Sequence, residues 1–173
     1  TSVVDRWGGV QILVNNAGIT GFCRFEEITE EMMDRMMQIN IKGPFLCTQA
    51  IIPDMVAAKW GRIVNISSSS AQTGAPMMAH YATSKGGIIA FTKTLAREYA
   101  DKGITVNNIP PGFVDTPMLR ASPVNVEEQA ASSPMKRAGK PEDIAAACSY
   151  LVSEAAGYVT GHTLGVNGGR VMP

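Results

Sequence analysis

Short apolar runs alternate with longer stretches of helical periodicity along the whole chain. Each run is bounded by Gly, Pro or Asn, as is typical of strands; the predicted strands are Ile12–Asn15, Gly61–Ser67, Thr105–Ile109 and Thr163–Val166. The stretches between the runs predict three helices, Thr29–Ala58, His80–Lys102 and Pro141–Ser153. Because strands that alternate with helices form right-handed βαβ units, the pattern predicts an α/β fold with a parallel sheet.

Punctuating residues refine the helix boundaries. Pro141 is suited to the first position of the last helix, and two acidic residues follow it in the first turn. The first long helix contains Gly43-Pro44 and Pro53, so we expect a kink near Asn40. Thr1–Trp7 is interpreted as the tail of a helix that Gly8-Gly9 ends.

Composition restricts the partners of the chain. It has 15 basic and 15 acidic residues, a formal net charge of zero and a pI near 6.7, which predict no nucleic-acid or anionic-membrane partner. With 45% hydrophobic and 17% charged residues, a substantial core is expected. The apolar runs fall short of the roughly 18 residues of a membrane span. Low charge together with ten methionines favours coverage by partner subunits, and a homotetramer is expected.

The cysteines and histidines predict no metal or disulfide chemistry. Cys23, Cys47 and Cys148 are odd in number and lack a C-x-x-C pair, so reduced thiols in a cytoplasmic protein are expected. His80 and His162 have no partner at ligand spacing, and no metal site is predicted. His80 precedes Tyr81 and faces another side of the helix, which leaves it at most a minor role in a substrate pocket.

One pair of residues carries acid–base chemistry. Tyr81 and Lys85 are four residues apart and share a helix face. A tyrosine has a reference pKa of about 10, and a neighbouring cation favours the phenolate, so we expect Lys85 to lower the pKa of Tyr81 toward the working range. Such a pair passes a proton to or from an alcohol or carbonyl oxygen, although a Y-x-x-x-K spacing alone is weak evidence.

Further motifs accompany this pair in a fixed order: Asn15-Asn16-Ala17-Gly18, Asn40, the serines Ser67 to Ser70, Pro111-Gly112, Tyr158-Val159-Thr160-Gly161 and Val166-Asn167-Gly168-Gly169. In order and spacing the set resembles the short-chain dehydrogenase/reductase family over essentially all 173 residues. The resemblance implies a doubly wound, Rossmann-like sheet and a single domain over residues 1–173. That family opens with a glycine-rich turn, T-G-x-x-x-G-x-G, which receives the cofactor pyrophosphate. The turn is absent here, so the chain is expected to comprise only the C-terminal two thirds of a domain.

The resemblance also implies catalytic roles for Asn40, Ser68, Tyr81 and Lys85. Ser68, thirteen residues before Tyr81, would position the substrate oxygen, whereas the other serines would cap a turn. Tyr81 would transfer the proton, and Lys85 would stabilise the phenolate and bind the nicotinamide ribose. Asn40, at the helix kink, would hold a water that links Lys85 to solvent. The alternatives are a turn-capping serine, surface residues and a purely structural asparagine.

The same resemblance implies a cofactor-binding set. It comprises Asn15, Ala17 and Gly18 beside the adenosine ribose, Tyr81 and Lys85, Pro111 and Gly112 beside the nicotinamide, and Val114 and Thr116 at the carboxamide. Asn16 is expected to be chiefly structural. Pro110 departs from the small residue that is usual before Pro-Gly, and it removes a backbone donor.

The expected function is that of an NAD(P)-dependent oxidoreductase, which moves a hydride between nicotinamide and a secondary alcohol or ketone. A 3-oxoacyl-carrier-protein reductase and a small or alicyclic alcohol dehydrogenase both fit. Lys59 and Lys102 lie where acyl-carrier reductases often carry basic residues, which makes an acyl carrier protein a candidate partner. The contrasting class is a non-enzymatic or truncated relative that acts as an oligomeric scaffold. The choice between NAD and NADP stays open, because the residue that reads the ribose lies on a strand outside this sequence.

Overall fold

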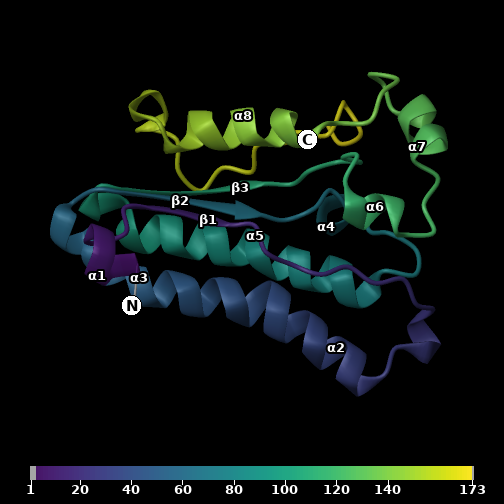
Figure 1. The fold of residues 1–173 in the computed structure, drawn as a ribbon, viewed down its shortest axis with the longest axis horizontal. Coiled ribbons are helices and arrows are strands. Elements are labelled where there is room, and N and C mark those ends of the chain that lie inside the picture. Colours follow the sequence, from purple (N-terminus) through teal and green to yellow (C-terminus); the bar gives the residue numbers. More distant parts are fainter. Residues whose placement is uncertain (1–2, 173) are drawn as a thin grey trace.

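The computed structural model describes residues 3–172 and shows a parallel sheet between two helical layers (Figure 1). The strands are β1 (Ile12–Asn15), β2 (Gly61–Ile66) and β3 (Ile104–Ile109), in the order β1-β2-β3. Helices α2, α3 and α5 lie on one face of the sheet and α8 on the other. Their bounds are Glu30–Met37, Gly43–Ala58, Ala79–Tyr99 and Pro141–Val152. The α/β, doubly wound, Rossmann-like fold predicted from the sequence is confirmed.

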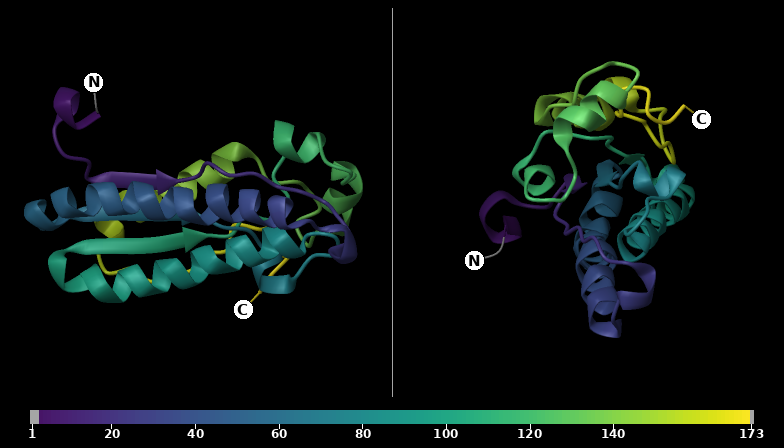
Figure 2. Two further views of the ribbon diagram at one scale, coloured as in Figure 1. Left: turned by 90° about the horizontal axis from the view of Figure 1, so that it is seen from below. Right: turned by 90° about the vertical axis from the view of Figure 1, so that its right-hand side faces the viewer.

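Strand register brings the carboxyl ends of the strands to one edge. Asn15 pairs with Asn65, and Ile66 pairs with Ile109, so the three strands end nearly level. In an open α/β sheet this is the edge at which ligands bind. The two further views in Figure 2 show the long helices α3 and α5 running alongside the strands.

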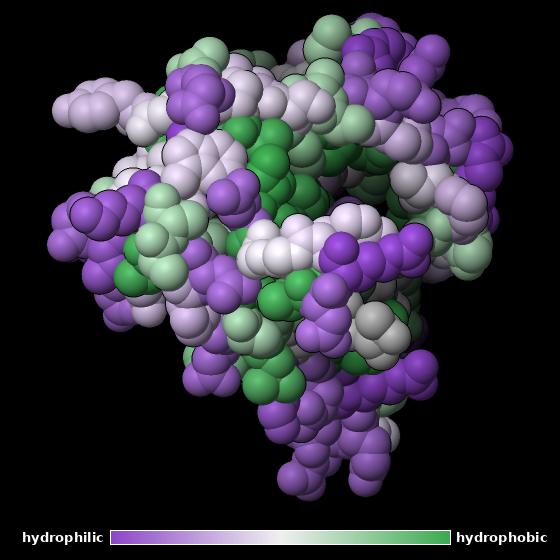
Figure 3. Space-filling view, turned by 60° about the vertical axis from the view of Figure 1, so that its left-hand side comes forward, coloured by the Kyte–Doolittle hydropathy of each residue, from purple (hydrophilic) through white to green (hydrophobic). Residues whose placement is uncertain are grey.

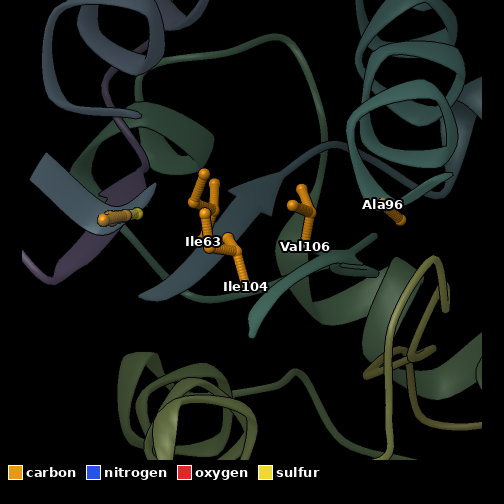
Figure 4. Close-up of a cluster of buried hydrophobic side chains, with 5 residues drawn as sticks. Ile63, Ala96, Ile104 and Val106 are labelled. Atoms are coloured by element: carbon orange, nitrogen blue, oxygen red, sulfur yellow. The ribbon is translucent and has the colours of Figure 1, made fainter. Parts of the chain in front are cut away.

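The core lies in two clusters, one on each face of the sheet. Met55, Ile63, Ala96, Ile104 and Val106 pack between the sheet and the α3/α5 layer (Figure 4). Val64, Ile66, Ile109 and Leu151 pack between the sheet and α8. Ile63 and Val64 point to opposite faces because side chains alternate along a strand. Strand β2 is buried along its whole length, as expected of a central parallel strand.

The expected strand Thr163–Val166 is not formed. The segment runs parallel to β3 with isolated pairings of Thr163 with Asn108 and of Val166 with Pro111. Leu164 N donates to Asn108 O at 2.8 Å, and Gly112 N donates to Val166 O at 3.2 Å. The intervening donor would be the N–H of residue 110, which is a proline. The ladder is therefore interrupted at Pro110.

The single helix expected over Thr29–Ala58 is divided into three parts. Thr29 caps α2, and its hydroxyl accepts from Met32 N at 3.3 Å. A π-helical turn, Gln38–Lys42, separates α2 from α3, which confirms the irregularity expected near Asn40. Because Pro44 has no N–H, the Asn40 carbonyl lacks its ordinary α-helical donor.

The remaining helices are short. Helix α1 (Val3–Trp7) ends at Gly8, whose φ is +82° and whose N–H donates to Val4 O, as predicted; Thr1 and Ser2 lie outside the described residues. Helix α4 (Ser70–Thr73) follows the serines, and α6 (Pro117–Arg120) and α7 (Val126–Ser132) follow the Pro-Gly turn. Single 3₁₀ turns occupy Phe25–Glu27, Ala100–Lys102 and Glu154–Ala156.

Apolar surface is gathered in a hollow on the face seen in Figure 3. Strand β1 is an edge strand among the described residues, with a partner on one side only. Its Ile12 and Val14 are 45% and 42% exposed, which is unusual for apolar strand residues. The edge of β1 is therefore an unpartnered surface in the described chain.

Candidate active site

Polar side chains gather just beyond the carboxyl ends of the strands. Tyr81 and Lys85 lie on the first turns of α5, Ser68 follows β2, and Asn40 lies in the π-helical turn. The Asn15–Gly18 segment follows β1, and Pro111-Gly112 follows β3. The fold thus brings the predicted residues to one edge of the sheet.

Lys85 is held beside Tyr81. Its Nζ lies 6.0 Å from the centroid of the Tyr81 ring and donates to Ile66 O at 3.0 Å. Lys85 is buried, with 6% of its surface exposed, whereas Tyr81 is half-buried. The carbonyl at the end of β2 therefore fixes the ammonium group next to the phenol.

The pKa values of the pair differ from the sequence-based expectation. Burial raises the pKa of Tyr81, and the hydrogen bond with Ser68 acts in the opposite direction. Burial lowers the pKa of Lys85 to about 8. The prediction that Lys85 lowers the pKa of Tyr81 is wrong for the described chain, because the loss of water around the phenol outweighs the effect of its polar neighbours.

Ser68 is free to donate toward Tyr81. Its hydroxyl oxygen accepts from Ser70 N at 3.2 Å and from Ser70 Oγ at 2.8 Å, which leaves its own hydrogen available. The expectation that the other serines cap the turn is only partly met: the Ser69 side chain makes no cap bond, and the buried Ser67 Oγ has no partner within the described residues. Ser68 thus both shapes the turn and faces the phenol.

Asn40 binds the loop that follows β1. Its Oδ1 accepts from Ile19 N at 2.9 Å, and its Nδ2 lies 3.0 Å from Ile19 O and 3.0 Å from Ser84 Oγ. The side chain is 1% exposed. These bonds occupy the side-chain amide, and the expectation that Asn40 holds a water stays a prediction.

The Asn15–Gly18 segment passes close to Asn40 and Lys85. A Cβ on Gly18 would lie 3.0 Å from Asn40 Oδ1 and 3.3 Å from Lys85 Nζ, so a side chain here would require one of these groups to shift. Asn15, in contrast, donates to Asn65 Oδ1 at 2.8 Å and to Thr48 Oγ1 at 3.2 Å. The Asn15 side chain therefore ties β1 to β2 and α3, while Asn16 and Ala17 are exposed. The Asn15 side chain thus has a structural role, and the expected contact of this segment with an adenosine ribose stays a prediction.

The Pro-Gly turn is anchored to both the serines and the chain end. Pro111 O accepts from Ser69 N at 2.9 Å. A Cβ on Gly112 would lie 2.9 Å from Asn167 Cα, so the C-terminal segment packs against a bare backbone. Val114 pairs with Gly139, and the Thr116 hydroxyl caps α6 by accepting from Leu119 N at 3.2 Å. The Thr116 hydroxyl is thus used by the helix, and its expected contact with a carboxamide stays a prediction.

Comparison with known proteins adds to this geometry. The family model described as enoyl-(acyl-carrier-protein) reductase matches residues 1–170. The chain is 46% identical over 163 residues to nodulation protein G of Azospirillum brasilense, which covers 94% of this chain and 66% of that protein. It is 42% identical over 171 residues to the 3-oxoacyl-[acyl-carrier-protein] reductase FabG of Thermotoga maritima, covering 98% of this chain and 70% of FabG.

The chain belongs to the short-chain dehydrogenase/reductase family. A solved structure titled "ElxO with NADP Bound" superposes with a TM-score of 0.90 at 31% identity, over 96% of this chain and 69% of that one. The chain thus spans about two thirds of the length of the relatives that it matches.

The sequence analysis did not predict a buried polar network behind the candidate active site. Ser84 Oγ donates to Tyr81 O at 2.7 Å and accepts from Asn40, so it joins the two elements that carry the predicted catalytic residues. Asn65, completely buried, donates to Thr92 Oγ1 at 2.9 Å. A small polar residue directly before Lys85 was the available signal for Ser84.

A pocket of about 360 Å³ lies away from these residues. It is bounded by the α7 region, the start of α8 and the C-terminal segment, and it contains neither Tyr81 nor Ser68. We assign the chemistry to the strand-end cluster, because that is where the titratable groups and the hydroxyls converge.

Two features are absent from residues 3–172. No helix there is long and apolar enough to cross a membrane. No group of three or more His, Cys, Asp or Glu side chains lies together as a metal site would require.

Proposed function

We propose that the protein is an NAD(P)-dependent oxidoreductase that reduces a 3-oxoacyl thioester to the 3-hydroxyacyl thioester. The observation that carries this proposal is the convergence of Ser68, Tyr81 and Lys85 at the carboxyl ends of β1 and β2, with the ammonium fixed by Ile66 O at 3.0 Å. The catalytic unit is a single domain to which residues 1–173 contribute. Relatives named as 3-oxoacyl-carrier-protein and acetoacetyl-CoA reductases, at 40–45% identity, support the substrate class.

The chain's own residues would supply orientation and the proton. Ser68, whose hydrogen is not used in its two bonds with Ser70, would donate to the substrate carbonyl oxygen and polarise it when substrate is bound. Tyr81 would donate its proton to that oxygen during reduction and accept a proton during alcohol oxidation. The raised pKa of Tyr81 keeps the phenol protonated near neutral pH, which is the form that reduction requires.

The residues fit a nicotinamide cofactor, which would supply the hydride. Lys85 has three N–H donors, of which one is directed at Ile66 O among the described residues, so two are available for ribose hydroxyls. The exposed Ala17 and the close-packed Gly18 would border the cofactor beside Lys85, with Pro111 and Gly112 across the site and Val114 and Thr116 beyond them. Since the ElxO structure contains NADP, NADPH is the first cofactor to test.

An acyl carrier protein is the proposed carrier of the substrate, with Lys59 and Lys102 as docking residues. Gly103 O, next to Lys102, accepts from Gly61 N at 3.3 Å, so the two lysines are near each other at the amino ends of β2 and β3. Ser68 and Tyr81 lie at the opposite ends of these six-residue strands, roughly 20 Å away. A carrier docked on these lysines would have to bridge that distance to deliver its substrate.

The proposal is tested with NADPH and NADH against a panel of a 3-oxoacyl thioester, a 2-enoyl thioester and simple ketones. Preferential oxidation of the reduced cofactor with the 3-oxoacyl thioester supports it. Preference for the enoyl thioester would favour the activity in the family model's description, and preference for a ketone would favour an alcohol dehydrogenase. Lys59→Ala with Lys102→Ala should raise the KM for carrier-bound substrate and leave the KM for a CoA thioester unchanged.

We also propose a homotetramer in the cytoplasm. Between α3 and α5 an apolar groove includes Phe45, Ile52, Phe91 and Leu95, and Phe45 and Leu46 are 46% and 49% exposed. Helix faces of this kind bury their surface against a symmetry mate. The three cysteines are free thiols, which accords with a reducing compartment.

A further inference from the structure

His80 is buried one residue before Tyr81 and has an unexplained environment. It is 3% exposed, and its Nδ1 has no hydrogen-bond partner within the described residues. A buried polar atom without a partner destabilises a folded protein, so such an atom calls for an explanation. From the sequence alone, His80 was expected to have at most a minor role in a substrate pocket.

The His80 ring packs against the loop that follows β1. An ideal Cβ on Gly21 would lie 2.8 Å from His80 Nε2 and 3.5 Å from Met36 Cε, so a side chain at residue 21 would force the ring or the loop to shift. Met36 belongs to α2, and its Sδ lies 3.0 Å from Asn40 Nδ2. The imidazole therefore fills the space between α5 and the loop and leaves Nε2 facing backbone at Gly21.

The loop is fastened at three points spaced two residues apart. Ile19 exchanges two hydrogen bonds with Asn40, at 2.9 and 3.0 Å. Gly21 rests on the His80 ring, and Cys23 N donates to Met77 O at 2.8 Å. Gly18, at the start of the loop, is the residue that approaches both Asn40 Oδ1 and Lys85 Nζ.

We propose that His80 is a positioning residue whose ring, matched to the bare backbone at Gly21, presses the 18–21 loop onto Asn40 and Lys85. The role is steric: the ring supports the loop, and the loop covers the ammonium group and limits the access of bulk solvent to Lys85, which is 6% exposed. His80 does not touch the reacting atoms, since its Nε2 faces Gly21 and its Nδ1 is enclosed. The consequence for turnover rests on the proposed function, whereas the consequence for Lys85 does not.

A double-mutant cycle between Gly21 and His80 tests the proposal in the intact protein. Gly21→Ala places a methyl against the ring and displaces the loop, and His80→Ala removes the support. Each single variant should lower kcat by about ten- to a hundredfold with a smaller change in KM, as expected for misplacement by about 1 Å. In the double variant the new methyl takes up part of the vacated space, so its kcat should exceed that of Gly21→Ala alone.

The second readout needs no substrate. Competitive acetylation with acetic anhydride across pH, followed by mass spectrometry, gives the apparent pKa of Lys85. In the wild type it should lie at about 8, and in each single variant it should rise toward the ordinary 10.5, because water reaches the amine. In the double variant the pKa of Lys85 should return part of the way toward the wild-type value of about 8. Thermal unfolding establishes that each variant is folded.

Two matched controls accompany the cycle. His162 is the other histidine and is exposed, and a Cβ on Gly86, also in α5, has nothing within 4 Å. His162→Ala and Gly86→Ala should leave the Lys85 pKa at about 8. The proposal is overturned if both single variants leave that pKa unchanged, or if the losses in kcat at residues 21 and 80 simply multiply. A shifted Lys85 pKa without any reductase activity would retain His80's role and refute the proposed function.

Discussion

At the scale of single residues, burial raises the pKa of Tyr81 by more than the hydrogen bond with Ser68 lowers it. Near neutral pH the phenol keeps its proton, which suits carbonyl reduction. Alcohol oxidation needs the phenolate, so it should become faster as pH rises. Ser68, whose hydrogen bond lowers the Tyr81 pKa, moves that rise to lower pH.

Ser68→Ala should therefore raise the pKa of Tyr81 further. In the oxidation direction, the pH at which kcat/KM reaches half its maximum should move to a more alkaline value, in addition to any loss of rate from poorer substrate orientation. The measurement is the pH profile of alcohol oxidation in both proteins. An unshifted profile with a reduced rate would mean that Ser68 acts on the substrate alone.

Lys85 should make stability depend on pH in a defined window. Its folded pKa of about 8 lies below the ordinary 10.5, so the unfolded state binds the proton more tightly. Below pH 8 both states are protonated, and burial of the charge reduces stability by a constant amount. Between about pH 8 and 10.5 this penalty disappears, and stability rises by on the order of 3 kcal/mol.

Urea unfolding of the wild type and of Lys85→Met from pH 7 to 10.5 measures this effect. The wild type should gain stability relative to the variant as pH rises, while the other titrating groups cancel in the difference. A difference that is constant with pH would show that Lys85 is hydrated in the folded protein.

The residues of the site were largely predictable from the sequence, whereas their hydrogen-bond partners were not. The order of Ser68, Tyr81 and Lys85 was visible as a motif. The Asn15 side chain donates to Asn65 and Thr48, and the His80 ring packs against Gly21. Both contacts join segments that are far apart in the chain. No local pattern encodes such contacts.

At the scale of elements, the differences between the predicted and the observed helices and strands arise at prolines and helix caps. Pro110 was identified from the sequence as a missing donor, but its consequence, the interrupted ladder beside Thr163–Val166, appeared only once the partner segment was known. Helices α6 and α7 were missed although Thr116-Pro117 and Asn125 carry start signals. Asn125 Oδ1 accepts from Glu128 N at 3.1 Å, which is a side-chain cap of a short helix.

The start of α8 provides an element-scale test. Asp143 accepts from Lys140 N at 2.8 Å and pairs with Arg137 at 2.8 Å, and these contacts lower its pKa to about 2. A depressed carboxyl pKa stabilises the fold above the unfolded value of 3.8, and this stabilisation disappears as pH falls toward 2. Asp143→Asn should therefore lower Tm at pH 6, and the difference from wild type should vanish between about pH 4 and 2. A difference that persists at pH 2 would assign the effect to helix packing.

At the scale of the whole molecule, the exposed apolar faces call for partners. Phe45 and Leu46 project from α3, and Phe45 lies 6.1 Å from the Phe91 ring of α5. If two such helices pair with their symmetry mates, light scattering at micromolar concentration should give four subunit masses. Leu46→Glu should reduce that mass to two subunits or one, because it places a charge in the contact. A wild-type monomer would contradict the assembly.

The central claim is that Tyr81 transfers the proton of the reaction, and Tyr81→Phe tests it most directly. Phenylalanine retains the ring but has no proton to give, so the rate of 3-oxoacyl thioester reduction should fall by at least about 10² to 10⁴ with an unchanged melting temperature. Tyr150→Phe, which removes a hydroxyl from the 46% exposed tyrosine of α8, is the matched control and should keep the wild-type rate. A folded Tyr81→Phe protein that retains more than about a tenth of the wild-type rate would contradict the assignment.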